Sequence, residues 1–346
     1  MAMTIVETRA ITGGVDTHLD THVAAALDSI GGVLGVESFL ATPDGYAQLF
    51  EWMSGFGPVT RVGVEGTGAY GAGLARFLRR ADVEVIEVDR PNRQARRAQG
   101  KSDPADAVEA ARAALSGRAH GLGKSADGAA EAMRVLLVAK RSARETRIKA
   151  LNQIRHLSFT APDELRERFR AIPRSSLASH GAALRPRLGD PVLHATKVSM
   201  STLGRRVLAL EDDDARMDAL LAELVTATAP SLLELYGVGI DTAAILLVTA
   251  GDNPERIRSE SAGAHLCGVA PVPASSGKVT RYRLNRGGNR QANHALWRIV
   301  LTRMSGHAHT RNYVARRLDE GRSKPEIIRV LKRYVAREVY RHLPRG

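Results

Sequence analysis

The first 120 residues alternate short apolar runs with segments whose apolar residues recur at helical spacing. Short apolar runs bounded by turn-forming residues predict β-strands, and repeats such as Leu74, Phe77 and Leu78 predict helices. The order is an antiparallel meander followed by strand–helix–strand–helix, which is typical of a mixed α/β sheet. The predicted strands are Ile11–Asp16, Val23–Leu27, Val33–Leu40, Val59–Glu65 and Val83–Val88, and the predicted helices are Pro43–Met53, Gly71–Arg80 and Ser102–Ser116.

The middle of the chain has helical periodicity and no strand pattern. Two long helices are predicted, at Ala129–His156 and Val198–Thr228, and the second carries a broken heptad-like stripe of apolar residues. The polar stretch Pro162–Asp190 is interpreted as the loop between them. Two long helices joined by a loop predict a helical hairpin or coiled coil. The alternatives are a structural spacer and an oligomerisation arm, and we favour the arm.

Leu235–Leu247 contains a Gly-Val-Gly turn that is followed by an apolar, alanine-containing helix. One interpretation is a helix-hairpin-helix-like element, in which a glycine turn lets backbone N–H groups approach a phosphate. The other interpretation is a packing corner between two helices. The sequence alone does not decide between them.

Positive charge is concentrated at the C-terminus. Residues 271–346 hold 18 Lys/Arg and 4 Asp/Glu, a net +14, whereas the other 270 residues hold 32 and 33, a net −1. Such a segregated charge favours a polyanionic partner, DNA or RNA, because binding phosphates releases counterions. Together with the patterns above, this predicts three regions: 1–122 (α/β), 123–229 (helical) and 230–346 (basic and mainly helical).

The single cysteine, Cys267, excludes a disulfide framework and a cysteine-rich zinc site. No apolar run approaches the length of a membrane span, and the first residues do not resemble a signal peptide. We therefore expect a cytoplasmic protein with no membrane partner.

Four carboxylates occupy positions that the predicted sheet would bring to one edge. Asp16 ends the first strand, Glu65 ends the fourth, and Asp103 and Asp106 open a helix, three residues apart and so on one face. In a mixed sheet of the ribonuclease-H type, which this element order matches, neighbouring strand ends and a helix start converge at one edge. Clustered carboxylates repel one another unless a cation neutralises them, and oxygen ligands favour Mg²⁺ or Mn²⁺.

Each acid also has a structural interpretation. Asp103 before Pro104 is a good helix cap, and Asp106 suits the helix dipole. Asp16 and Glu65 could be surface acids, and Asp20 or Asp89 could substitute for one of the four. Their joint placement favours the metal site.

Five segments resemble the IS110 group of insertion-sequence transposases. In the N-terminal region these are Gly14–Asp20 (GVDTHLD), Val64–Tyr70 (VEGTGAY) and Lys101–Ala107 (KSDPADA), which resemble the DEDD domain of that group; Thr17, His18 and Gly66 stand where other residues are also common. In the C-terminal region they are Leu266–Gly277 (LCGVAPVPASSG) and Asn285–Arg290 (NRGGNR), after the glycine turn. The motifs follow the family's order over nearly the whole chain.

The resemblance implies a RuvC-like ribonuclease-H domain, a helical coiled-coil arm and a mainly helical C-terminal transposase domain. It implies that Asp16, Glu65, Asp103 and Asp106 are catalytic and hold Mg²⁺ (or Mn²⁺). It also implies a nucleophilic serine, which aligns best with Ser276, with Ser275 as the alternative. The implied partners are donor and target double-stranded DNA, a structured guide RNA, and further copies of the chain in a dimer or tetramer.

Basic residues near the serine motif are candidate phosphate contacts: Arg281, Arg283, Arg286 and Arg290, together with Asn289. Tyr282 and Trp297 could stack on bases, although Trp297 on an apolar helix face suits a core position. A basic amphipathic helix is predicted at Val330–Leu343. Its predicted packed face is Val330, Leu331, Tyr334, Val335 and Val339, and its predicted phosphate- or solvent-facing residues are Arg329, Lys332, Arg333 and Arg337.

Three functions remain open at this point. The first is a transposase or site-specific recombinase, guided by RNA, that uses the metal site and the serine. The second is a metal-dependent nuclease of the junction-resolving type that forms no covalent intermediate. The third is a nucleic-acid-binding protein without catalysis. We rank them in this order, and a covalent protein–DNA adduct separates the first from the second.

Overall fold

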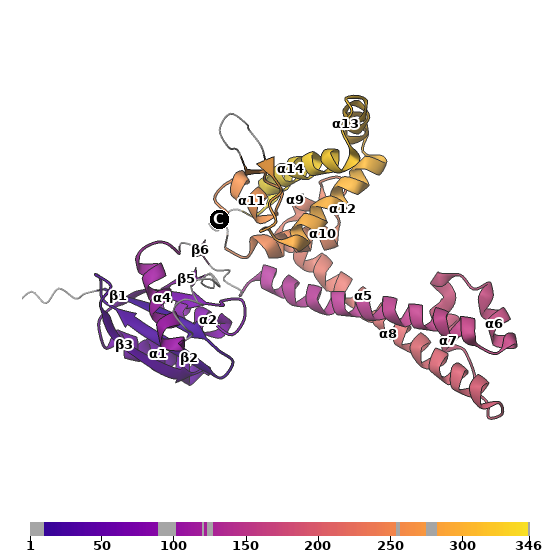
Figure 1. The fold of residues 1–346 in the computed structure, drawn as a ribbon, viewed down its shortest axis with the longest axis horizontal. Helices are drawn as coiled ribbons and strands as arrows, with labels where there is room; N and C mark the ends of the chain where they lie inside the picture. The colour runs from indigo at the N-terminus through magenta and orange to yellow at the C-terminus, as the bar shows by residue number, and fades with distance from the viewer. Residues whose placement is uncertain are drawn as a thin grey trace, which may run out of the picture. The chain divides into compact units, whose positions relative to one another are not determined.

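The computed structural model describes residues 10–88, 102–119, 121–122, 127–253, 257–274 and 282–344. Contacts group these into two units (Figure 1). The N-terminal unit comprises residues 1–130 and 250–259, and the C-terminal unit comprises residues 131–249 and 260–344. The division into three regions at 122/123 and 229/230 stays a prediction. None of the helices in the described ranges is long and apolar enough to cross a membrane.

The N-terminal unit is a mixed sheet with helices on both faces, as the sequence predicts. The strand order is β3-β2-β1-β4-β5-β6; β1 pairs antiparallel with β2 and parallel with β4. Most elements agree with their predicted bounds to within one or two residues. The elements are β1 (Ile11–Thr17), β2 (Thr21–Leu27), β3 (Val33–Leu40), α1 (Pro43–Ser54), β4 (Val59–Glu65), α2 (Ala72–Arg80), β5 (Glu84–Val88), α4 (Asp103–Leu115) and β6 (Gly121–Leu122).

The two faces of this sheet are packed differently. Val15, Val62 and Val64 join α1 and α2 in a core that includes Leu49 and Leu74. The opposite face, which α4 covers, carries small residues and a smaller apolar cluster that includes Val23 and Ala107. Because successive strand residues point to opposite faces, the even-numbered residues of β1 face α4.

The C-terminal unit is almost entirely helical in its described residues. Its elements are α5 (Ala129–Thr160), α6 (Asp163–Arg170), the 3₁₀ turn η1 (Arg174–Ser176), α7 (Leu177–Ala182), α8 (Pro191–Thr228), α9 (Pro230–Leu233), α10 (Ile240–Ala250), α11 (Glu260–Leu266), β7 (Val272–Pro273), β8 (Tyr282–Arg283), α12 (Arg290–Gly306), α13 (Ala308–Asp319) and α14 (Lys324–His342).

The two long helices α5 and α8 are joined by ion pairs at heptad spacing. Lys140 pairs with Asp218, and Arg147 pairs with Glu211, at 3.0 Å. A step of seven residues forward along α5 is therefore a step of seven backward along α8, so the helices run antiparallel at these pairs (Figure 1).

The stretch between these helices is not the loop that the sequence predicted. Residues 163–170 and 174–182 form α6, η1 and α7, and α8 begins at Pro191 instead of Val198 because Asp190 caps it. Leu165, Phe169 and Leu177 are buried in a shared core with α5 and α8. Their sparse spacing among arginines and prolines hid this core from the pattern analysis.

Candidate metal centre and nucleic-acid interface

Asp16 and Glu65 lie at the carboxyl ends of two adjacent parallel strands. Val15 of β1 is in register with Val64 of β4, so the next residue on each strand, Asp16 and Glu65, occupies the same edge. Both acids are buried, at 5% and 6% exposed. Thr17 Oγ1 donates a hydrogen bond to the Glu65 backbone oxygen at 2.7 Å, which ties the two strand ends together.

Helix α4 lies directly on these two strands because glycine stands beneath it. A Cβ atom at Gly14 would come 2.2 Å from the Ala111 nitrogen, and one at Gly63 would come 2.4 Å from the Ala110 oxygen. Gly14 and Gly63 are register partners. Asp16 and Glu65, two residues further along each strand, therefore point to the face that α4 covers.

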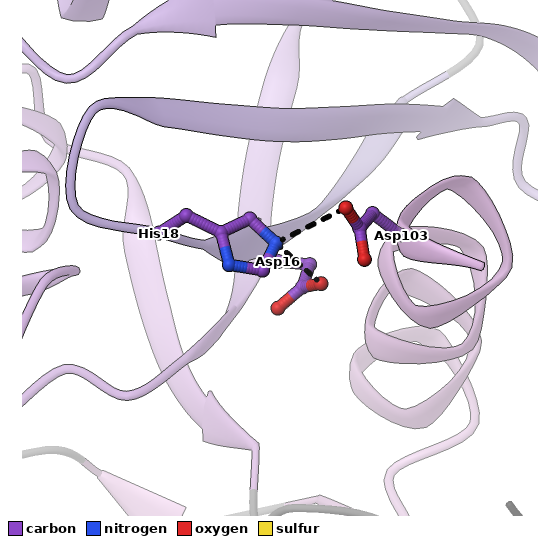
Figure 2. A group of neighbouring side chains, drawn as sticks. All are labelled: Asp16, His18 and Asp103. Carbon is purple, nitrogen blue, oxygen red and sulfur yellow. Dashed lines mark ion pairs between the residues drawn. The ribbon is translucent and has the colours of Figure 1, made fainter. Parts of the chain in front are cut away.

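The N-terminus of α4 brings Asp103 to Asp16. Helix α4 starts at Asp103, and the Ser102 hydroxyl accepts a hydrogen bond from the Ala105 nitrogen, so Ser102 caps the helix. Asp16, His18 and Asp103 each offer a ligand atom, and these atoms lie within 4.8 Å of one another (Figure 2).

His18 was not among the site residues predicted from the sequence. Its Nε2 atom lies 3.2 Å from Asp16 Oδ2 and 3.4 Å from Asp103 Oδ2. That atom is buried and has no hydrogen-bond partner, although the side chain is 36% exposed. The signal available in the sequence was the spacing Asp-x-His at a strand end, which places both side chains on one face.

Glu65 and Asp106 lie outside the group of three ligand atoms that the structure brings together among the described residues. Glu65 ends β4, the neighbour of β1, and Asp106 lies in the first turn of α4. Their assignment as ligands stays a prediction, as does the functional role of Asp16 and Asp103.

The residues at this edge fit a divalent cation. Two carboxylates from different elements and a buried imidazole nitrogen that makes no hydrogen bond converge within 4.8 Å. Carboxylate oxygen suits both Mg²⁺ and Mn²⁺, and imidazole nitrogen suits transition-metal ions, the class to which Mn²⁺ belongs. The donor set is therefore compatible with either ion proposed from the sequence.

In the C-terminal unit, the motif that begins at Leu266 contacts the motif at 285–290. Gly288 packs so closely on Gly268 that a Cβ atom would lie 2.2 Å from the Gly268 nitrogen. The Asn289 nitrogen donates to the Leu266 oxygen at 2.7 Å. Asn293 then donates to the carbonyl oxygens of Cys267 and Gly268, at 3.0 and 3.1 Å. The motif at 285–290 is thus fastened to the motif that begins at Leu266.

Some of the other residues predicted to contact nucleic acid lie outside the described residues, and the rest are described. Ser275, Ser276 and Arg281 lie outside the described residues, in the sequence between β7 and β8, which pair antiparallel. Arg283, Arg286 and Arg290 are exposed. The Asn289 side chain accepts from the nitrogens of Gln291 and Ala292, so it caps α12. These residues' roles in binding stay predictions.

Cys267 is not a competing nucleophile. Burial raises the pKa of its thiol to about 11, so the reactive thiolate is scarce near neutral pH. Its backbone oxygen instead accepts the hydrogen bond from Asn293.

The glycine turn at Gly237–Gly239 is packed against α12. Gly237 has φ +83, and a Cβ atom there would lie 3.2 Å from the Ile299 oxygen. The Gly239 nitrogen donates to the Thr242 hydroxyl at 3.0 Å. The turn borders a hollow of about 370 Å³ that is also lined by Asp241, Arg298 and Thr302. These contacts are those of a packing corner, and phosphate binding by the turn stays a prediction.

Helix α14 corrects the predicted face assignment. Leu331, Val335 and Val339 are buried as expected, but Val330 and Tyr334 are 36% and 52% exposed. The helix begins earlier than predicted, at Lys324, because Ser323 and Glu326 form a capping box.

Two basic residues of α14 are paired within the unit. Arg333 forms an ion pair with Glu260, which Arg337 also approaches at 3.5 Å. Lys332 Nζ donates to Asn293 Oδ1 at 2.8 Å, and burial, with the nearby charge of Arg329, lowers its pKa. Lys332 and Arg333 are thus partly buried, and acceptors from distant parts of the sequence bind them. Their contact with phosphate stays a prediction.

The two aromatic candidates for base stacking are accessible. Tyr282 on β8 is 63% exposed and Trp297 on α12 is 38% exposed. Trp297 therefore does not occupy the core position that its apolar helix face suggested. Whether either ring stacks on a base stays a prediction.

Comparison with known proteins gives two family matches and one curated relative. Residues 13–160 match a DEDD-type IS110 family model described as a transposase. Residues 229–315 match a model described as the transposase IS116/IS110/IS902 family. The relative is the "Insertion element IS110 uncharacterized 43.6 kDa protein" of Streptomyces coelicolor, 30% identical over 142 residues. That similarity covers 39% of this chain and 34% of the relative, so the chain spans about a third of the relative's length.

Proposed function

The chain belongs to the IS110 family of transposases, and from this premise we propose that it cuts DNA and rejoins the ends at new positions. The observation that carries the proposal is the convergence of Asp16 and Asp103. They come from a strand end and a helix start, yet their ligand atoms lie within 4.8 Å of each other. Carboxylates held this close favour a bound divalent cation.

The architecture that goes with this function is a RuvC-like ribonuclease-H domain, an antiparallel coiled-coil arm and a C-terminal transposase domain. The mixed sheet with α4 on the acidic face supports the first. The heptad-spaced pairs between α5 and α8 support the second. A helix-hairpin-helix-like role for the glycine turn remains part of the proposal.

Asp16, Glu65, Asp103 and Asp106 would hold Mg²⁺ or Mn²⁺. When bound, such an ion stabilises the charge that develops on a phosphodiester under attack. The protein's own part is to hold the four carboxylates in place. Gly14 and Gly63 contribute by letting α4 pack directly on the strands. The hydrogen bond from Thr17 to Glu65 contributes by joining the two strand ends.

The proposed nucleophile is Ser276, with Ser275 as the alternative. Its oxygen would attack the scissile phosphorus and form a phosphoserine ester, while one deoxyribose oxygen leaves and takes up a proton. A hydroxyl of another strand would later attack the same phosphorus and release the serine. A serine hydroxyl needs activation to act in this way, which an assembled carboxylate site beside it would supply.

Donor and target duplexes are the proposed substrates, and a structured RNA is the proposed guide. The net +14 of residues 271–346 supports a nucleic-acid partner. Arg283, Arg286 and Arg290 are exposed, follow the serine motif in the sequence and are proposed phosphate contacts, with Arg281 and Asn289. A dimer or tetramer would bring the carboxylates of one copy to the serine of another.

The test is a search for a covalent adduct. The full-length protein is combined with RNA transcribed from its flanking noncoding DNA, labelled donor and target duplexes, and Mg²⁺, and is run on a denaturing gel. We expect a labelled adduct with the wild type and with Ser275→Ala, but none with Ser276→Ala or Asp16→Asn.

Other outcomes separate the alternatives. Cleaved DNA without an adduct, together with a fully active Ser276→Ala protein, would establish a metal-dependent nuclease and refute the serine mechanism. Tight DNA binding with neither cleavage nor adduct, unchanged in Asp16→Asn, would favour a binding protein without catalysis.

A further inference from the structure

His18 is placed where a metal ligand would be. It follows β1 directly, and its backbone nitrogen donates to the Thr21 oxygen at 3.0 Å, within the turn that leads into β2. The backbone is therefore fixed by a short hairpin connection. The ring then extends across the end of α4, so that Nε2 faces Asp16 and Asp103 together (Figure 2).

The imidazole nitrogen lies at ion-pair distance from two carboxylates but forms no hydrogen bond with either. Nε2 is buried and accepts or donates no hydrogen bond. Buried polar atoms that make no hydrogen bond are rare in folded proteins. A cation shared with the two carboxylates would satisfy this nitrogen and would also relieve the repulsion between the acids.

We infer that His18 is a direct metal ligand and that it gives this site a preference for Mn²⁺ over Mg²⁺. This inference rests on the proposed function, which places a cation among the same carboxylates. Mg²⁺ is a hard ion that favours oxygen and retains several waters, whereas Mn²⁺ accepts imidazole nitrogen more readily. Replacing one oxygen ligand by nitrogen therefore favours Mn²⁺.

The experiment uses the full-length, metal-free protein with Mn²⁺ or Mg²⁺ alone and with no nucleic acid. Electron paramagnetic resonance reports free and bound Mn²⁺, and Mg²⁺ affinity follows from competition. His18→Asn replaces the ring nitrogen with an amide group that can offer oxygen. We expect it to weaken Mn²⁺ binding about tenfold or more and to change Mg²⁺ binding much less.

A second readout does not depend on any variant. Pulsed electron paramagnetic resonance of the wild-type Mn²⁺ complex detects a directly bound nitrogen through its hyperfine coupling. We expect this coupling in the wild type and in His309→Asn, which alters an exposed histidine of α13. We expect no coupling in His18→Asn.

The possible failures are distinguishable. If Mn²⁺ binds in the wild type and is lost in Asp16→Asn, but no nitrogen coupling appears and His18→Asn binds normally, the role of His18 is refuted and the carboxylate site stands. If the wild type binds neither ion, both this inference and the proposed metal site fail.

Discussion

Lys140 is a charged side chain held inside a helical unit by carboxylates from two other helices. It is 4% exposed on α5, and it pairs with Asp218 of α8 and Asp241 of α10. Arg144 and Arg298 also approach Asp241, at 3.5 and 3.6 Å. Four helices are therefore joined at one charge cluster, whose central Lys140 is buried.

Removing this lysine should destabilise the C-terminal unit strongly. Breaking a buried ion pair by deleting one partner typically costs about 3–5 kcal/mol, and we expect Lys140→Met to lie near the lower end because both arginines still neutralise Asp241. Urea unfolding followed by circular dichroism measures the change. The matched control is Arg147→Met, one heptad away in a more exposed pair, which should cost less than about 1 kcal/mol.

The pH dependence of this stability follows from the two pKa shifts. For Asp241, burial acts to raise the pKa, but the hydrogen bond and charge of Lys140, with the two arginines, hold it below its usual range. For Lys140, burial acts to lower the pKa, but hydrogen bonds to Asp218 and Asp241 raise it overall.

The stabilisation from Asp241 is thus present above the carboxyl's unfolded pKa and is lost as pH falls through its depressed folded pKa. The stabilisation from Lys140 is present below its unfolded pKa and is lost as pH rises through its raised folded pKa. The difference between wild type and Lys140→Met should be largest between these limits. An equal difference at pH 3 and pH 7 would contradict this account.

At the scale of elements, the docking of α4 on β1 and β4 decides whether the acidic site forms. The helix backbone approaches both strands where Gly14 and Gly63 carry no side chain. Asp103 then reaches Asp16 because it opens that helix. The geometry of the site therefore depends on packing one to three turns away from the acids.

A methyl group at this contact should displace the helix. Gly14→Ala would place its Cβ atom 2.2 Å from the Ala111 nitrogen, and overpacking of this kind typically costs about 1–3 kcal/mol. We expect both a lower unfolding midpoint and weaker Mn²⁺ binding.

The matched control for this contact is Gly68→Ala. Gly68 has no atom within 4 Å of an added Cβ, so the substitution should leave stability nearly unchanged. If Gly14→Ala bound metal as tightly as wild type and unfolded at the same urea concentration, the close contact with α4 would have no bearing on the site.

At the scale of the whole molecule, the segregated charge gives a quantitative expectation for DNA binding. Residues 271–346 carry net +14, but several of their cations are already paired, including Arg333 with Glu260 and Arg303 with Glu338 at 2.6 Å. Arg283, Arg286 and Arg290 are exposed, and they are the arginines that we propose to contact phosphate.

Salt dependence of binding by the full-length protein tests this distribution. Each phosphate contact contributes about 0.9 to the slope of log K against log salt. Arg283→Ala, Arg286→Ala and Arg290→Ala should each reduce the slope by about that amount. Arg174→Ala, an exposed arginine of η1, should leave it unchanged. Equal slopes for all four variants would exclude this surface as the phosphate interface.

Elements set by interactions between near neighbours in the chain agree with the sequence predictions, whereas features set by long-range contacts do not. The strands and helices around the acidic edge agree with their predicted bounds to within one or two residues for the most part, because alternation, periodicity and caps are properties of near neighbours. The core between α5 and α8 escaped prediction because its members, Leu165, Phe169 and Leu177 among them, are too sparse to form a local pattern.

By itself, the sequence determined which acids end strands and open a helix, where positive charge gathers, and which family motifs occur in which order. The tertiary structure decided which side chains meet. It set His18 beside Asp16 and Asp103, and it paired Arg333 with Glu260, 73 residues away in the chain. Periodicity assigns a residue to a face, but its partner depends on how closely a distant element packs, and at α4 that distance is set by Gly14 and Gly63.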